Sequence, residues 1–280
     1  MTRIAIASGK GGTGKTLVAT NLAAVAQDAL LVDLDVEEPN CSLFFQCVDQ
    51  SREIVNRKVP FVREEKCTAC GTCAKVCEFH AIVSLPKEVL VFDELCHGCG
   101  ACSMFCPEEA IKERDHPVGE IVVANVEGLR GLTYGRLRIG EASASPLIKR
   151  VKKEIPEDGL TIIDCPPGTA CPAVESMRGS DLCVLVTEPT PFGFHDLKLA
   201  LAVAKKLKLP HVVLVNKKGL PGPDIERFCE DNKIPVVGDL PLAREIAETY
   251  SKGRLLVSEA KYERAFKLLL SRLLEEADLL

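Results

Sequence analysis

Short runs of consecutive apolar residues alternate along the chain with longer stretches in which apolar residues recur every three or four positions. An uninterrupted apolar run is typical of a strand buried on both faces, and the longer spacing is typical of an amphipathic helix. The alternation predicts an α/β fold, with a mostly parallel sheet and helices on both of its faces. The predicted strands lie near residues 3–8, 29–34, 121–125, 160–164, 181–187, 211–216 and 235–238, and the predicted helices cover 15–27, 145–154, 194–208, 223–232, 241–251 and 259–277.

A cysteine-rich segment interrupts this alternation between Pro60 and Pro117. Its two halves, CTACGTCAKVCEFHAI from Cys67 and CHGCGACSMFCPEEAI from Cys96, repeat with an offset of 29 residues. The pattern of strands and helices resumes on either side, so the sequence predicts a small domain inserted into the α/β domain. The predicted division is 1–57 and 119–280 for the α/β domain and 58–118 for the insert.

The overall composition is that of an ordinary folded protein, with 46% hydrophobic and 27% charged residues. A net charge of −5 argues against broad electrostatic binding to nucleic acid or to a membrane surface. The stretch from Ile4 to Ala7 leads directly into a glycine loop instead of a signal-peptide cleavage pattern. We therefore expect a cytoplasmic protein. In that reducing compartment, 14 cysteines predict metal or iron–sulfur ligation rather than disulfides.

The glycine-rich loop follows the first predicted strand and precedes the first predicted helix. Its sequence, GKGGTGKT from Gly9 to Thr16, matches the phosphate-binding pattern G-x-x-x-x-G-K-[ST]. Backbone N–H groups of such a loop surround phosphate oxygens, and the helix N-terminus adds its positive end. We expect Lys15 to neutralise the β- and γ-phosphates and the Thr16 hydroxyl to bind Mg²⁺. The residues expected to bind the nucleotide are Gly11, Gly12, Thr13, Gly14, Lys15 and Thr16.

Two further apolar runs end in polar side chains. Leu160 to Ile163 is followed by Asp164, and a carboxylate at the end of a buried strand can hold the water shell of Mg²⁺. The run from Val212 to Val215 is followed by Asn216, a residue type that also ends strands for turn-making reasons. No Asp stands two residues after Lys217, as it does in guanine-binding proteins, so ATP is favoured over GTP.

Each half of the cysteine segment has the spacing C-x2-C-x2-C-x3-C. This is the pattern of bacterial ferredoxins with two 4Fe-4S clusters, in which the fourth cysteine of each run ligates the other cluster. Zinc is the alternative, but zinc sites of this kind use two pairs of ligands. The predicted ligands are Cys67, Cys70, Cys73 and Cys106 for the first cluster, and Cys96, Cys99, Cys102 and Cys77 for the second.

Together these motifs resemble the MinD/ParA/Mrp superfamily of P-loop ATPases, which includes the nitrogenase iron protein, with an inserted two-cluster ferredoxin domain. KGGTGKT is similar to the deviant Walker A motif of that superfamily, and DCPPGT from Asp164 is similar to its Walker B motif and switch II. The resemblance implies an ATP-bound homo- or heterodimer in which Lys10 reaches the partner's nucleotide. It also implies that Asp35, which ends the switch I segment LLVDLD, orients water or contacts Mg²⁺, and that Asn216 contacts adenine.

The implied catalytic residues are therefore Lys10, Lys15, Asp35 and Asp164, and the implied cofactors are ATP, Mg²⁺ and two 4Fe-4S clusters. Two functions fit these features. The first is an ATPase whose hydrolysis controls electron transfer from the clusters to a redox partner. The second is a carrier that delivers an iron–sulfur cluster or metal cofactor to an apo-protein acceptor. Interlocked cysteine runs should hold their clusters permanently, which favours electron transfer.

Other thiols and the C-terminal stretch are predicted to have structural roles. Cys183 lies within an apolar run and is expected to be a small buried residue. Cys171 lies near where the nitrogenase iron protein holds a shared cluster, but no second ligand stands beside it, so a structural role is expected there too. The apolar stripe between Tyr262 and Leu280 is followed by acidic residues, which favours packing on the sheet over binding to a membrane.

Overall fold

The computed structural model describes residues 1–278, so the last two residues of the predicted 119–280 segment lie outside it. Within this range, one sheet has the strand order β11-β10-β9-β1-β8-β2-β7-β6-β3. Neighbours from β11 to β7 are parallel, whereas β6 pairs antiparallel with both β7 and β3. Its strands are β1 (Thr2–Ala7), β2 (Leu30–Asp33), β3 (Cys47–Val62), β6 (Ile111–Val126), β7 (Gly131–Leu137), β8 (Leu160–Asp164), β9 (Leu182–Thr187), β10 (His211–Lys218) and β11 (Val236–Pro241).

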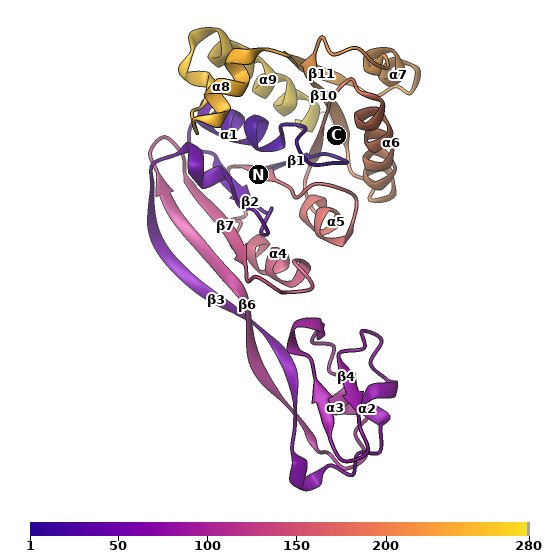
Figure 1. Ribbon diagram of the computed structural model, residues 1–280. Helices are drawn as coiled ribbons and strands as arrows, with labels where there is room; N and C mark the ends of the chain where they lie inside the picture. Colours follow the sequence, from indigo (N-terminus) through magenta and orange to yellow (C-terminus); the bar gives the residue numbers. More distant parts are fainter. Residues whose placement is uncertain (279–280) are drawn as a thin grey trace.

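Helices cover both faces of this sheet, which confirms the predicted α/β class (Figure 1). One face packs against α1 (Lys15–Ala26), α8 (Arg244–Ser251) and α9 (Ala260–Asp278). The other packs against α4 (Ser145–Lys152), α5 (Cys171–Met177), α6 (Pro191–Lys206) and α7 (Ile225–Asp231).

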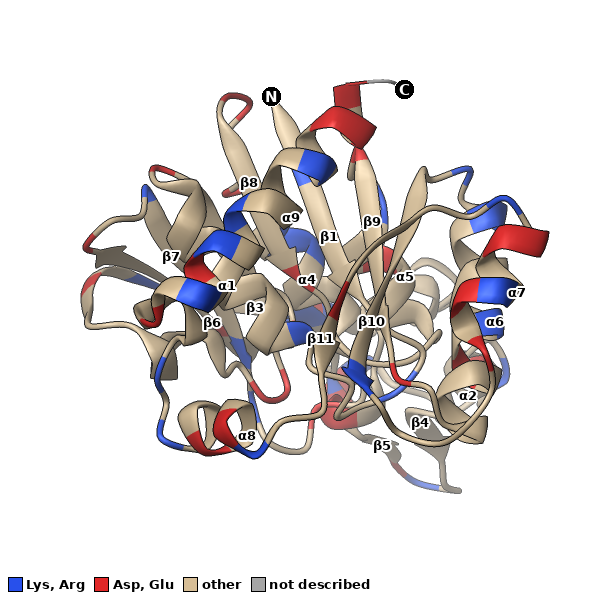
Figure 2. Cartoon of the chain, turned by 90° about the horizontal axis from the view of Figure 1, so that it is seen from above, with Lys and Arg blue, Asp and Glu red and all other residues tan. Residues whose placement is uncertain are grey.

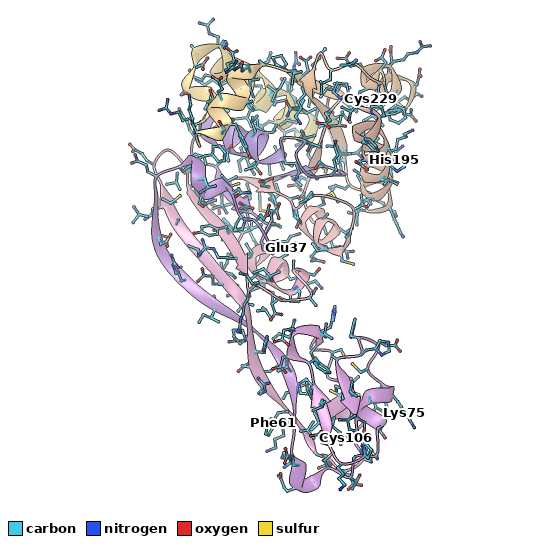
Figure 3. The ribbon with its side chains drawn as sticks, viewed as in Figure 1. Glu37, Phe61, Lys75, Cys106, His195 and Cys229 are labelled. Atoms are coloured by element: carbon cyan, nitrogen blue, oxygen red, sulfur yellow. The ribbon has the colours of Figure 1, made fainter. Side chains whose placement is uncertain are left out.

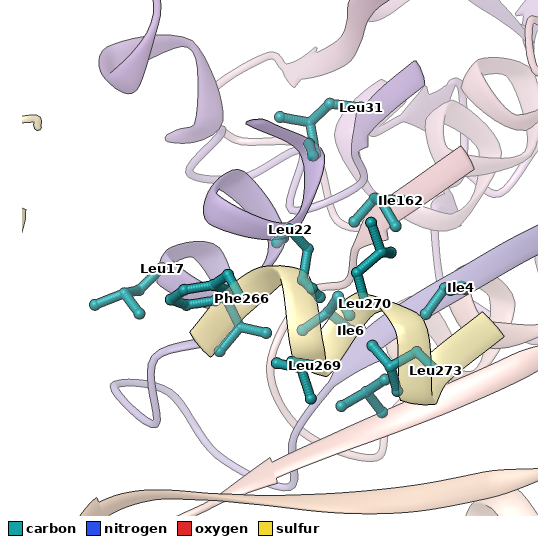
Figure 4. Close-up of a cluster of buried hydrophobic side chains, with 14 of the residues drawn as sticks. Ile4, Ile6, Leu17, Leu22, Leu31, Ile162, Phe266, Leu269, Leu270 and Leu273 are labelled. Atoms are coloured by element: carbon teal, nitrogen blue, oxygen red, sulfur yellow. The ribbon is translucent and has the colours of Figure 1, made fainter. Parts of the chain in front are cut away.

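Apolar side chains of α1 and α9 meet over the central strands. Figure 4 shows Leu22 of α1 beside Phe266 and Leu270 of α9, with Ile4 and Ile162 of the sheet next to Leu270. The predicted apolar stripe of α9 is thus buried, and its packing on the sheet is confirmed. Figure 2 shows acidic residues gathered at the C-terminal end of this helix.

The strands β3 and β6 form a long two-stranded ribbon that extends from the sheet (Figure 1). Both strands run without a break through the predicted junctions near residues 58 and 118, so neither junction is a loop. The predicted strand 121–125 is therefore much too short, and β3 was not predicted. Most side chains of β3 are exposed on both faces, so the strand has no apolar run to reveal it.

Residues 63–110 fold at the far end of the ribbon into a small unit (Figure 1). Its two halves have the same backbone shape at the same repeat positions. Gly71 and Gly100 have φ values of 78° and 72°, and His80 and Glu109 have φ values of 51° and 48°. The sequence repeat is thus also a structural repeat. The unit contains α2 (Thr72–Lys75), β4 (Ile82–Ser84), β5 (Val89–Val91) and α3 (Ala101–Met104).

The remaining differences from the predicted elements are small. β7 and α5 were not predicted, because β7 is short with glycine at two of its seven positions, and α5 has only seven residues. The helix predicted at 194–208 begins three residues earlier, at Pro191, because Thr190 caps it. Its hydroxyl oxygen accepts a hydrogen bond from the Gly193 N–H at 3.0 Å.

Candidate functional site

The glycine-rich loop, residues 9–16, lies between β1 and α1. Gly14 directly precedes α1 and has a φ of 97°, a left-handed backbone conformation that favours glycine. A Cβ atom at Gly14 would lie 2.2 Å from Nδ2 of Asn216, so close packing also requires glycine there. The loop therefore leads into the helix N-terminus in the way that a phosphate cradle needs.

Lys15, Thr16 and Asp164 come together at the start of α1. The Thr16 hydroxyl donates a hydrogen bond to Oδ2 of Asp164 at 2.6 Å. The other carboxylate oxygen, Oδ1, is buried and has no hydrogen-bond partner among the described residues. Burial also raises the pKa of Asp164. A buried carboxylate with a free oxygen beside a threonine hydroxyl fits Mg²⁺ and its water shell.

Asp33 is a residue of this site that the sequence did not single out. It pairs in register with Asp164 on the neighbouring strand. Ligand atoms of Asp33, Cys41 and Asp164 all lie within 4.8 Å of one another, and all three residues are buried. Burial, followed by the charge of Asp164, raises the pKa of Asp33 to about 8. A cation between the two carboxylates would remove this repulsion.

Asp35 lies at the edge of the same cluster and is half-buried. Burial raises its pKa to about 6, and the charge of Asp164 adds to the rise while that of Lys15 opposes it. Its backbone N–H donates to Oδ1 of Asp33 at 3.0 Å. The predicted switch I residue is thus held beside the predicted Walker B residue.

Lys10 pairs within its own chain with Glu188, a residue that the sequence analysis missed. The Glu188 side chain is 8% exposed, and its second oxygen lies 2.8 Å from Nζ of Lys217. Burial alone would raise the pKa of Glu188, but hydrogen bonds from Lys10 and Lys217 outweigh burial and lower it. An acid directly after a buried strand was the available signal, since Glu188 follows β9 as Asp164 ends β8.

Asn216 braces the glycine-rich loop. Its Nδ2 donates to the Thr13 carbonyl at 2.7 Å, and its Oδ1 accepts from the Lys217 N–H at 2.8 Å. The same residue lines a mostly apolar cavity next to the loop, so the adenine contact stays a prediction. The cavity is lined by Gly12, Gly14, Leu17, Asn216, Lys217, Pro241, Leu242, Ala243, Ile246, Ala247 and Tyr250.

The eight cysteines of the small unit surround two separate cavities. The first is lined by Cys67, Cys70, Cys73 and Cys106. The second is lined by Cys77, Cys96, Cys99 and Cys102. These are the two sets that the spacing predicted, including the exchange of Cys77 and Cys106 between the halves. In each set the third cysteine of the run is buried and the second is exposed.

Backbone N–H groups point at sulfur atoms in both halves. The Ala69 and Gly98 amides donate to Cys67 and Cys96, each at 3.4 Å. The Ala81 and Ala110 amides donate to Cys77 and Cys106, each at 3.3 Å. N–H bonds of this kind stabilise negative charge on sulfur and tune the potential of a bound cluster.

The other thiols lie in the sheet domain. Figure 3 labels one of them, Cys229, and one cysteine of the small unit, Cys106. Cys183 is fully buried, which confirms its predicted packing role. Cys171, the first residue of α5, is exposed, and its structural role stays a prediction. It lies on the surface because the chain turns there, after the predicted switch II, to start a short helix.

The loop, the buried acids and the mostly parallel sheet define a P-loop nucleotide-binding domain. The family model described as the CobQ/CobB/MinD/ParA nucleotide binding domain matches residues 4–257, and the chain belongs to this family.

The chain is also similar to two proteins in sequence and to solved structures in fold. An uncharacterised protein of Methanocaldococcus jannaschii is 33% identical over 226 residues, which cover 78% of this chain and 79% of the relative. A second uncharacterised protein of that organism is 29% identical over 257 residues, 89% of each chain. The septum site-determining protein MinD of Pyrococcus horikoshii, complexed with Mg-ADP, has a TM-score of 0.60 and 20% identity, and the match covers 97% of this chain and 95% of that one. The MinD of an Aquifex aeolicus MinC:MinD complex has a TM-score of 0.58 and 15% identity, covering 98% and 96%.

Within residues 1–278, no helix is both long enough and apolar enough to cross a bilayer.

Proposed function

We propose that this protein is an ATP-hydrolysing iron–sulfur protein that couples its nucleotide state to electron transfer through two 4Fe-4S clusters. The observation that carries the proposal is the sorting of eight cysteines into two sets around two cavities. Each set takes three ligands from one run and one from the other, so the two clusters would fasten the halves of the unit together.

The spacing of the sulfur atoms supports clusters over single zinc ions. In a tetrahedral zinc site with Zn–S distances of ~2.3 Å, sulfur atoms lie about 3.8 Å apart. Among the described cysteines, no three of these sulfur atoms lie within 4.8 Å of one another. Four cysteines line each cavity, which is the number that a cubane needs, because each of its four irons is bound by one thiolate. When bound, such clusters accept and donate single electrons.

The nucleotide chemistry follows from the buried acids. Lys15 and the loop amides would bind the phosphates, and Thr16 and Asp164 would hold Mg²⁺. Asp35 would orient the attacking water, with Asp33 fixing its backbone through the hydrogen bond at 3.0 Å. We further propose that the active form is a dimer in which Lys10 leaves Glu188 and contacts the partner's nucleotide.

A carrier function is the second candidate, and one observation favours it. Cys70 and Cys99 are exposed, so each proposed cluster has one accessible ligand through which it could pass to an apo-protein acceptor. Against this, Cys73 and Cys102 are buried in the core of the unit. We therefore favour electron transfer, with a redox partner as the acceptor.

A redox titration distinguishes these functions. Anaerobically purified protein is titrated without nucleotide, with Mg-ADP and with a non-hydrolysable ATP analogue, and the same preparations are tested for cluster transfer to an apo-ferredoxin. Electron transfer predicts a midpoint potential or oxidation rate that depends on the nucleotide. Superimposable potentials and rates together with ATP-dependent cluster transfer would overturn it in favour of the carrier. The Asp164→Asn variant, whose Mg²⁺ site is weakened, should lose the nucleotide dependence in either case.

A further inference from the structure

Buried charged side chains meet where the ribbon leaves the sheet domain. We name Arg57 of β3, His116 of β6, Glu141 of the β7–α4 loop and Asp93 of the small unit the charged joint. The Arg57 and Glu141 side chains are only 5% and 1% exposed, and Nη2 of Arg57 lies 2.9 Å from Oε2 of Glu141. Nε2 of His116 lies 2.7 Å from the other Glu141 oxygen. Glu141 of the sheet domain is thus held by both strands of the ribbon.

The charged joint also reaches the second set of cysteines. Nη2 of Arg57 donates to the Asp93 carbonyl at 2.8 Å, and the same oxygen accepts from the Cys96 N–H at 3.1 Å. Nδ1 of His116 lies 3.5 Å from the Asp93 carboxylate. A Cβ atom at Gly98, two residues after Cys96, would lie 2.8 Å from Cγ of Arg57. The arginine therefore packs directly on the loop that holds Cys96 and Cys99.

Away from the small unit, the charged joint is connected to the segment that carries Asp35. The Leu137 N–H donates to the carbonyl of Val36 at 2.8 Å, which ties the end of β7 to the residue after Asp35. A Cβ atom at Gly135 would lie 2.6 Å from Cγ1 of Val36, so the two segments are in tight contact. Glu141 lies only four residues beyond Leu137.

We propose that Glu141 is a positioning residue that transmits the nucleotide state of the Asp35 segment to the second set of cysteines. This inference rests on the proposed function. A shift of Val36 on nucleotide exchange would move the end of β7 and with it Glu141. A buried carboxylate cannot be left without its partners, so the guanidinium of Arg57 and the imidazole of His116 must follow it. Arg57 then moves relative to Asp93 and Gly98, and its positive charge changes the field at the thiolates of Cys96 and Cys99.

The test compares nucleotide-dependent redox potentials of cluster-loaded wild type and the Glu141→Gln variant. A coupling of about tenfold between nucleotide state and reduction corresponds to about 59 mV for a one-electron couple. We expect the wild type to show a difference of this order between Mg-ADP and a non-hydrolysable ATP analogue, and Glu141→Gln to lose most of it. Amide hydrogen exchange of residues 93–99 gives a second readout, which should depend on the nucleotide in the wild type alone.

Two further variants keep the test decisive. Removing one partner of a buried ion pair is destabilising, so a double variant, Arg57→Met with Glu141→Leu, removes both charges together and retains the bulk of the side chains. Glu120→Gln is the matched control, because Glu120 pairs with Arg136 at 3.0 Å on the exposed part of β6 and should leave the coupling unchanged. If Glu141→Gln and the double variant both retain the full nucleotide dependence of the redox potential, the inference is refuted. A wild type whose potential does not depend on the nucleotide would also refute the inference. If its oxidation rate does not depend on the nucleotide either, the proposed function is refuted.

Discussion

In the sheet domain the phosphate-binding loop rests on a large apolar core, whereas in the small unit the proposed ligands are themselves the core. The buried core of the small unit consists of Cys73, Cys102 and Ile82, together with Ile111 at the start of β6. The apolar core under α1 and α9 includes Leu22 and Phe266. It contains none of the cysteines that are proposed to bind an iron–sulfur cluster. The difference predicts that the nucleotide site stands on a fold that is stable by itself, while the fold of the small unit would depend on the proposed clusters.

Removal of the iron–sulfur clusters should therefore have the largest effect on stability. The small unit should lose its structure, while the sheet domain should keep its own. We expect about eight irons per chain in anaerobically purified protein, because each of two cubanes holds four. After chelation, amide hydrogens of residues 63–110 should lose protection, while those of β1 and α1 should keep theirs. Mass-spectrometric hydrogen exchange with metal analysis measures both. Stoichiometric zinc with negligible iron, or a small unit that stays protected without metal, would contradict the comparison.

Lys15→Ala should have the next largest effect, and the effect should be confined to the sheet domain. Loss of a charged hydrogen-bond donor to phosphate costs about 2–3 kcal/mol, or roughly 30- to 150-fold in ATP affinity. The iron content should not change. Lys10→Ala is the matched control, since we expect it to leave ATP binding nearly intact and to weaken ATP-driven dimerisation, measured by sedimentation. Equal loss of binding in both variants would mean that Lys10 is an ordinary contact of the loop.

The buried acids predict that the stability of the sheet domain depends on pH. The pKa of Asp33 is raised in the folded state to about 8, so the folded protein holds a proton there that the unfolded chain releases near pH 4. Without metal, the stability from this group is fully present below about pH 4 and is lost progressively as pH rises to about 8. We expect a decrease of about 1–3 kcal/mol between pH 5 and 9, which Asp33→Asn should flatten. Urea unfolding with and without Mg²⁺ measures this, and a stability that rises over the range would contradict it.

Glu188→Gln should have the smallest effect. It frees Lys10 from a partly exposed ion pair, which is worth about 1 kcal/mol, so ATP-driven dimerisation should tighten by about fivefold. Glu226→Gln provides the control, because it removes the exposed pair with Lys218 at 2.6 Å and should leave dimerisation unchanged. Weaker dimerisation of Glu188→Gln would show that Glu188 supports the dimer and does not hold Lys10 back.

Local patterns explain why some of these features could be predicted and others could not. The phosphate loop and both cysteine runs are contiguous, and their spacing alone predicted the sulfur sets that the fold brings together. Asp33 could not be selected, because its proximity to Asp164 depends on the pairing of β2 with β8. The charged joint could not be predicted either, since Arg57 and Glu141 lie far apart in sequence and meet only through the ribbon.

Because of the ribbon, the small unit can be deleted from the chain without changing the sheet. Val62 and Ile111 face each other in the register of β3 and β6, so the chain leaves and re-enters the ribbon at adjacent points. A two-residue turn such as Asn-Gly can join strands that end in this way. Replacing residues 63–110 by such a turn would leave the order of the sheet unchanged. In evolutionary terms, we infer that a single insertion or deletion at one hairpin is enough for a sheet domain of this kind to acquire or lose such a unit.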